Sequence, residues 1–218
     1  MTSDIGLIGT FSFLALLPFL IASGTCYIKF SIVFVMVRNA LGLQQVPSNM
    51  TLNGVALLLA LFVMAPVARD AYQSFHEQGV DTSSAESVMN FMDNGLDGYK
   101  TYLQKYTDPD LAQFFEKAQS QNSGDNEVED GLSSSSMLAL LPAYALSEIK
   151  NAFKIGFYLY LPFVVVDLLI SSILLALGMM MMSPITISVP IKLILFVVLD
   201  GWTLLSKGLI LQYIDLAT

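Results

Sequence analysis

Long apolar runs alternate with polar segments along this chain of 218 residues. A helix that crosses a bilayer needs about 20 mostly apolar residues, and the runs approach or exceed that length. The pattern therefore predicts an all-α protein built from membrane-type helical hairpins with four spans. In chain order, the apolar runs cover residues 5–37, 54–68, 138–182 and 191–216.

Interruptions inside the runs predict where helices break. Ser23-Gly24-Thr25 is typical of a helix break or a close-packing point. In the third run, Glu148 and its basic neighbours indicate an interruption before the run resumes at residue 155. A short break is also expected at residues 183–188, which lie beside Pro184 and Pro190.

A polar insertion separates the second run from the third. Residues 88–106 carry apolar side chains at steps of three and four, which predicts a helix with one apolar face. Thr107-Asp108-Pro109-Asp110 predicts a second helix start, with Thr107 as the cap. Residues 119–136 are polar, acidic and rich in serine, so we expect a disordered linker.

Charge divides the chain into the same three parts. Charged residues make up 13% of the chain, against about 25% in soluble domains. Residues 70–130 hold 13 acids and 3 lysines (−10), and the remainder holds 5 acids and 7 bases (+2). We therefore expect N-terminal hydrophobic helices at 1–69, an acidic helical insertion at 70–136 and a C-terminal hydrophobic hairpin at 137–218. Arg38 in a short loop favours a cytoplasmic loop and an extracytoplasmic insertion.

Several functional classes lose support from the composition. A net charge of −8 disfavours nucleic acid as a partner, and Cys26 as the single cysteine excludes an intrachain disulfide. His76 lies in a polar stretch and is expected to be solvated. Asp167 and Asp200 lack the glycine-rich context of an intramembrane aspartyl protease. We therefore expect no catalysis, no cofactor and no metal.

The charges left in the apolar runs need partners, because an unpaired charge in an apolar helix is costly. If the chain turns near residues 179–188, Asp167 and Lys192 lie about 18 Å and 15 Å from the turn along their helices. We expect these two to form a buried pair. The pair either braces the hairpin or neighbouring subunits, or lines a conduit. Lys29 and Asp200 are further candidate intramembrane charges.

Four consecutive methionines, Met179-Met180-Met181-Met182, adjoin the predicted break. Methionine is unbranched and adaptable, so it fills irregular gaps and can repack around different partners. The run is either filler in a membrane core or a deformable apolar constriction. Its position at a break favours the constriction, because irregular backbone at membrane depth is tolerated where it lines a cavity.

Two blocks of sequence resemble the export-gate family of type III secretion, which includes the flagellar FliP protein and its injectisome counterparts. They are Pro18–Leu57 and Ala152–Trp202, and the second contains the specific elements LGMMM and LDGW. The layout of two apolar regions, a variable insertion and two more apolar regions is similar as well. The sequence detail is closest to the injectisome R-subunit (Spa-type) branch.

This resemblance implies a homopentamer that joins small Q-type subunits, a T-type subunit and other inner-membrane export components. It implies an entrance pore for unfolded secreted proteins at the bacterial inner membrane, with the assembled core at or above the periplasmic face. The family's methionine gasket corresponds to Met179, Met180 and Met181, and its hairpin charges correspond to Asp167 and Lys192. Met182 departs from the flagellar pattern. The alternatives are an ion-coupled transporter that uses the four intramembrane charges, and a scaffold without a pore.

Overall fold

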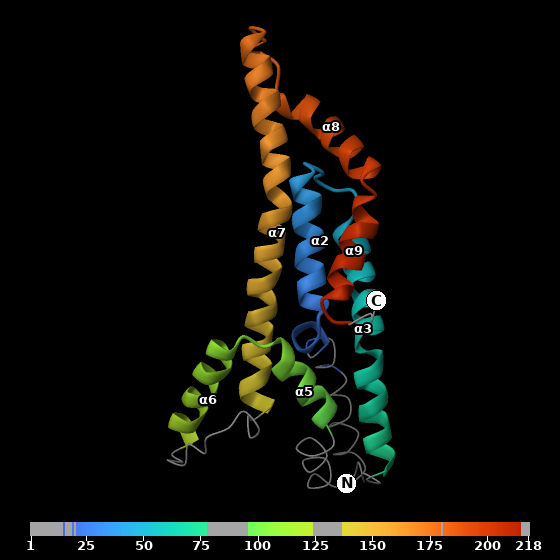
Figure 1. The fold of residues 1–218 in the computed structure, drawn as a ribbon, viewed down its shortest axis with the longest axis vertical. Coiled ribbons are helices and arrows are strands. Elements are labelled where there is room, and N and C mark those ends of the chain that lie inside the picture. The colour runs from blue at the N-terminus through green and yellow to red at the C-terminus, as the bar shows by residue number, and fades with distance from the viewer. Residues whose placement is uncertain are drawn as a thin grey trace. The chain divides into compact units, whose positions relative to one another are not determined.

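The fold is described from a computed structural model, in which residues 15, 19, 21–77, 96–123, 137–179 and 181–214 are described (Figure 1). All regular elements in these ranges are helices, so the all-α prediction is confirmed for them. The helices are α2 (Tyr27–Ala40), α3 (Asn49–Glu77), α5 (Asp97–Tyr106), α6 (Pro109–Ser123), α7 (Met137–Ala176), α8 (Pro184–Val198) and α9 (Gly201–Leu211).

Two described helices are long and apolar enough to cross a membrane, namely α3 and α7. A third crossing is added if α8 and α9, which meet at a 60° bend, are taken as one broken span. Four spans were predicted, but the first part of the first apolar run, up to residue 20, lies largely outside the described residues. Helix α3 also extends beyond its apolar run at both ends, whereas α7 ends at Ala176, before the third run does. Helix α3 continues past residue 70, where the charge pattern places the start of the insertion.

The charged residues that interrupt the third apolar run do not end its helix. Helix α7 is continuous over 40 residues, or about 60 Å, and it includes Glu148, Lys150 and Lys154. Glutamate and lysine are both good helix formers, so charged residues in an apolar run do not themselves end a helix. Glu148 is fully buried, whereas Lys150 projects from the helix and forms an ion pair with Asp108.

The chain forms two compact units. The insertion unit comprises residues 1–28 and 64–150, and the apolar unit comprises residues 29–63 and 151–218. Because α2, α3 and α7 each pass from one set of residues to the other, each helix contributes to both units.

Aromatic hydroxyl groups organise the core of the insertion unit. The hydroxyl groups of Tyr102 on α5 and Tyr144 on α7 lie 2.7 Å apart, and Tyr144 is fully buried. Tyr99 donates a hydrogen bond of 2.7 Å to the backbone oxygen of Gly24. Burial raises the pKa of Tyr99 to about 12. The Tyr99 phenol therefore stays neutral and can serve as a hydrogen-bond donor.

The predicted break at Ser23-Gly24-Thr25 is confirmed. A helical segment ends at Gly24, and α2 begins at Tyr27 after a two-residue interruption. The Thr25 hydroxyl donates to the Ile21 oxygen and accepts from the Tyr27 amide, so it bonds both sides of the break. A Cβ atom at Gly24 would collide with the Tyr99 hydroxyl, which makes this point one of close packing as well.

The helix start at residues 107–110 is confirmed, but its cap is Asp108 rather than Thr107. The Asp108 carboxylate accepts the Asp110 amide at 3.1 Å as α6 begins. Thr107 instead closes the end of α5, because its hydroxyl donates to the Leu103 oxygen at 2.7 Å. A carboxylate also favours the positive end of a helix more than a hydroxyl does.

Helix α6 corrects part of the predicted linker. Gln119–Ser123, which we expected to be disordered, form its last residues, and 124–136 lie outside the described residues. The helix predicted at residues 88–106 is present as α5 at 97–106. Residues 88–95 lie outside the described residues.

The apolar unit packs around the buried face of α2, which carries Phe30, Val33, Phe34 and Val37. Trp202 on α9 contacts the Phe34 ring edge-on, at 6.1 Å between centroids. Arg38, at the end of α2, donates to the Pro47 oxygen and the Asn49 side chain. The loop between α2 and α3 covers residues 41–48. Arg38, which we expected in this loop, lies in α2 and forms hydrogen bonds with Pro47 of the loop and with Asn49.

Candidate functional site

A methionine turn, defined here as Leu177–Ser183, joins α7 to α8 within the apolar unit. Gly178 adopts a left-handed conformation (φ 70°), which ends α7. The Met179 amide then donates to the Leu174 oxygen at 2.9 Å and caps the helix end. Helix α8 begins at Pro184, a position where proline is well tolerated.

The break predicted at residues 183–188 therefore lies earlier in the chain than expected. Pro190, expected to flank it, lies inside α8. The glycine at 178 marks the break better than the prolines do, because proline is accepted in the first turns of a helix but glycine supplies the positive φ that ends one.

The side chains of the methionine turn lie on the surface of the chain. Met179 and Met182 are 39% and 42% exposed, and Met181 is fully exposed. Met180 lies outside the described residues. The flanking Leu175, Leu177 and Ile185 are exposed too, so several apolar side chains are exposed at the end of this hairpin.

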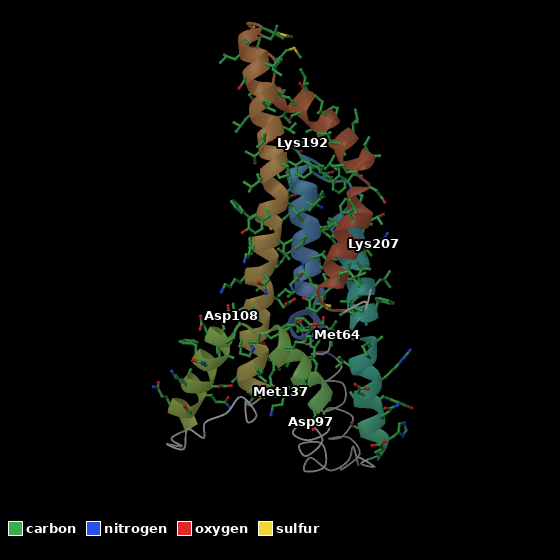
Figure 2. All side chains as sticks on the ribbon, in the orientation of Figure 1. Met64, Asp97, Asp108, Met137, Lys192 and Lys207 are labelled. Carbon is green, nitrogen blue, oxygen red and sulfur yellow. The ribbon has the colours of Figure 1, made fainter. Side chains whose placement is uncertain are left out.

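Asp167 on α7 lies in contact with Lys192 on α8. Figure 2 labels Lys192 on α8. The Lys192 ammonium nitrogen lies 2.5 Å from the Asp167 carboxylate. Asp167 is nine residues before the end of α7 and Lys192 is eight after the start of α8. Both therefore lie about 12–14 Å from their helix ends.

Burial differs between the two partners of this ion pair. The Lys192 side chain is 5% exposed, whereas that of Asp167 is 40% exposed. The pair is thus buried on the lysine side only, which corrects the expectation of a fully buried pair. One face of the Asp167 carboxylate remains open at the surface of the chain.

The Ala40 carbonyl is a third member of this site, and it was not predicted from the sequence. Asp167, Lys192 and the Ala40 oxygen are called the charge site below. Lys192 also donates to the Ala40 backbone oxygen at 3.1 Å. Ala40 is the last residue of α2, and the carbonyl groups at a helix end carry partial negative charge. The ammonium therefore joins α7, α8 and the end of α2. The only signal for it in the sequence was the end of the first apolar run just before Ala40.

The other two candidate charges lie in different settings. Lys29 is buried, donates to the Gln212 side chain at 3.4 Å and lies 4.5 Å from the centre of the Tyr213 ring. Asp200 is exposed in a left-handed conformation (φ 50°) between α8 and α9. Asp200 was expected within an apolar helix, but it lies at the 60° bend between α8 and α9, which together form most of the fourth run.

His76 is exposed near the end of α3, as expected, and its ring packs edge-on against Tyr72. Within the described ranges no group of three or more histidine, cysteine, aspartate or glutamate side chains is placed to hold a metal ion.

Comparison with known proteins places these features in a family. The model described as the FliP family matches residues 10–209. The chain belongs to the FliP family. The family was expected from the two blocks and the LGMMM and LDGW elements, and that expectation is confirmed.

Relatives of this FliP-family chain match it end to end. It is 66% identical to the surface presentation of antigens protein SpaP of Salmonella typhimurium, over 100% of both chains. It is 64% identical to SpaP of Shigella flexneri over 99% of both, and 46% identical to the Yop proteins translocation protein R of Yersinia pestis over 98% of both. FliP-family relatives of this kind are export-apparatus proteins of type III secretion, and the apolar helices indicate a membrane protein.

Proposed function

We propose that this chain is a core subunit of the type III secretion export gate, through which unfolded proteins enter the secretion path. Five copies would form a ring at the bacterial inner membrane together with Q-type and T-type subunits and other export components. The assembled core would lie at or above the periplasmic face, with the insertion on the periplasmic side. Relatives named for protein translocation support this proposal.

The observation that carries the proposal is the exposed methionine turn. An exposed apolar turn is costly in water, and Met181 is fully exposed among the described residues. A ring of such turns would bring flexible thioether side chains together and seal a passage against water and ions. Because methionine adopts many conformations, the same seal could open around side chains of any size.

The charge site supports the turn mechanically. A hairpin that carries a seal must hold its two helices in register, and the contacts of Lys192 with Asp167 and Ala40 join three helix segments. The open face of Asp167 leaves room for a hydrogen bond from a neighbouring subunit. In this proposal the energy for transport comes from other components.

Replacement of Met179, Met180 and Met181 by alanine tests the seal. Removal of three thioethers per copy opens space that the smaller alanine side chains cannot close. We therefore expect increased ion conductance across membranes that contain the assembled complex, measured by planar-bilayer recording. The matched control is Met50→Ala, because Met50 is also exposed but lies near the start of α3. Unchanged conductance in the triple variant, with normal assembly, contradicts the seal.

Crosslinking separates a gate from a scaffold without a pore. A photoreactive side chain at Met181 should crosslink to a secretion substrate that is stalled during export, whereas the same group at Met50 should not. Absence of substrate contact at Met181 in a complex that still secretes would favour the scaffold.

A further inference from the structure

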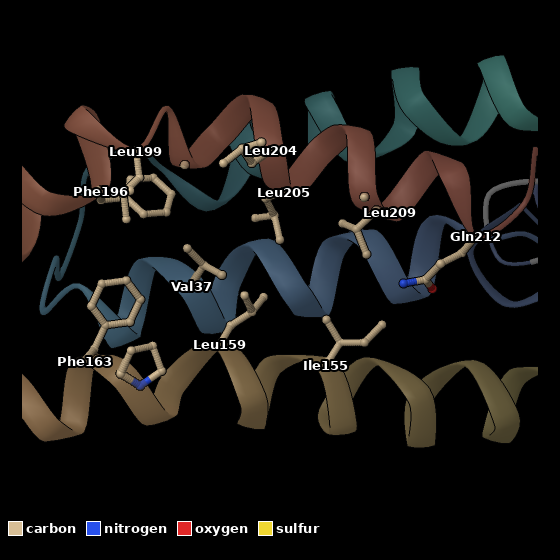
Figure 3. Close-up of a pocket in the computed structure, with 13 residues that line it drawn as sticks. Val37, Ile155, Leu159, Phe163, Phe196, Leu199, Leu204, Leu205, Leu209 and Gln212 are labelled. Atoms are coloured by element: carbon tan, nitrogen blue, oxygen red, sulfur yellow. The ribbon is translucent and has the colours of Figure 1, made fainter. Parts of the chain in front are cut away.

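An apolar groove of about 410 Å³ opens on the apolar unit, between α2, α7, α8 and α9 (Figure 3). The volume falls within the range of about 300–1,000 Å³ that small-molecule sites occupy. Gln212 is the only polar side chain among the lining residues that the structure describes. Phe163 and Phe196 lie at one end, and Gln212 lies at the other.

The length of the groove fits one layer of a bilayer. Its α7 wall extends from Ile155 to Phe163, or about 12 Å along the helix. The hydrocarbon core of a bilayer is about 30 Å thick, so the acyl chains of one leaflet span about 15 Å.

Charge is distributed unevenly between the two ends. At the Gln212 end, the Lys29 ammonium donates to the Gln212 amide oxygen. Two exposed lysines, Lys154 and Lys207, directly precede the lining residues Ile155 and Gly208. Asp215 also follows Gln212, but it lies outside the described residues.

The aspartates of the apolar unit that the structure describes belong to the other end of the groove. Asp200 directly follows the lining residue Leu199, and Asp167 lies one turn of α7 beyond Phe163, where it is bound to Lys192. The groove therefore combines a neutral apolar body with a basic polar end.

We propose that this groove binds one acyl chain of a phospholipid, with the lipid phosphate at the Gln212 end. The groove is neutral and apolar, and it is about as long as one bilayer leaflet is thick, so it suits a single hydrocarbon chain. The lysines at the Gln212 end complement an anionic headgroup, so phosphatidylglycerol should bind more tightly than phosphatidylcholine. This site does not depend on the role of the methionine turn.

Gly208 offers a direct way to fill the groove. A Cβ atom at Gly208 would meet open space, and this residue lines the groove on α9. Leucine is a better helix former than glycine, so the Gly208→Leu variant should fold, and its side chain should fill the groove. Gly54→Leu is a matched control, because Gly54 is also an exposed helical glycine with open space at its Cβ position, but it does not line the groove.

Trp202, the only tryptophan of the chain, reports on this site. Its ring packs edge-on against Phe196, a lining residue, at 5.3 Å between centroids. Brominated acyl chains quench tryptophan on contact. The experiment reconstitutes the full chain in bilayers with increasing fractions of brominated phosphatidylglycerol or brominated phosphatidylcholine, and records Trp202 fluorescence.

For the unmodified chain and for Gly54→Leu, we expect a quenching phase that saturates at low mole fraction, reached severalfold earlier with phosphatidylglycerol. Gly208→Leu should lose this phase and retain only the gradual quenching by bulk lipid. Native mass spectrometry should find one phospholipid retained per copy in the first two proteins and none in Gly208→Leu. Gly208→Ala, the milder variant, should retain an intermediate fraction.

Identical quenching curves for Gly208→Leu and the unmodified chain would overturn the proposal. So would a Gly208→Leu variant that changes the number of subunits in the complex but leaves the phospholipid count unchanged. That result would assign the groove to a second copy of the chain.

Discussion

The insertion unit and the apolar unit solve the burial of polar groups in different ways. In the insertion unit, neutral hydroxyl groups pair with one another and with backbone oxygens, as Tyr102 does with Tyr144 and Tyr99 with Gly24. In the apolar unit, a buried ammonium, Lys192, is held by a carboxylate and a backbone carbonyl. The comparison contrasts hydrogen bonds between neutral groups in the first unit with bonds to a buried charge in the second.

Lys192 should give the largest effect of any single change in this comparison. Lys192→Asp places a carboxylate beside Asp167 and the Ala40 oxygen, so three acceptors face one another without a donor. Loss of one partner of a buried ion pair lowers the free energy of unfolding by about 3–5 kcal/mol. Because Asp167 is partly exposed to solvent, we expect a value near the lower end of this range. We expect little folded protein in the membrane fraction, measured by quantitative blotting, and no secretion.

Two double variants sharpen this prediction. Asp167→Lys combined with Lys192→Asp should restore only part of the folded protein, because the Ala40 carbonyl cannot donate to the new carboxylate. Asp167→Asn combined with Lys192→Met removes both charges and should be close to the unmodified chain in stability. Normal stability with lost secretion in this neutral variant would assign the charges to transport rather than to bracing.

The tyrosine pair of the insertion unit should respond more mildly. Tyr144→Phe removes the 2.7 Å bond and leaves the buried Tyr102 hydroxyl to its other neighbours, at a cost of about 1–2 kcal/mol. Thermal unfolding of the full chain in detergent measures this change. Tyr102→Phe combined with Tyr144→Phe should cost less than the sum of the single changes. Strict additivity would show that the two hydroxyl groups do not stabilise each other.

The smallest effect should come from the ion pair at the start of α6. A hydrogen bond from Lys150, helped by the Asp110 amide, holds the pKa of Asp108 below its ordinary value of 3.8. A lowered carboxyl pKa stabilises the fold above 3.8, and this contribution is lost as the pH falls through the lower folded value. Because the pair is exposed to solvent, it contributes little to stability.

Lys150→Met should raise the pKa of Asp108 toward 3.8, which an NMR titration of the carboxyl carbon can follow. Lys154→Met removes a similar exposed lysine one turn along α7 and should leave the Asp108 titration unchanged. An equal shift in both variants would mean that general charge, rather than the specific bond, sets this pKa.

The features that sequence reasoning anticipated depend on short distances along the chain. The break after Gly24 follows from local residue preferences, and the equal depth of Asp167 and Lys192 follows from helix geometry around a turn. The break expected at residues 183–188 was placed too late, because it was assigned from two prolines, whereas Gly178 ends α7.

The missed features depend on contacts between distant segments or on competition between neighbours. The Ala40 carbonyl reaches Lys192 across more than 150 positions, and no side-chain pattern marks a backbone oxygen as a ligand. Thr107 and Asp108 are both good caps, and the choice between them was decided because the Thr107 hydroxyl closes the end of α5 instead. The groove beside Gly208 likewise requires four helix segments to be in place.

The sparse burial of α7 has a consequence for how the stability of this protein can be measured. Only 11% of the most apolar part of α7 is buried within the chain. A molecule that covers the rest and binds the folded form more tightly than the unfolded chain adds to the free energy of unfolding by mass action. At a hundredfold excess over its dissociation constant, one such ligand contributes about 2.7 kcal/mol. The melting temperature therefore depends on the detergent, lipid and subunits present in the sample as well as on the chain itself.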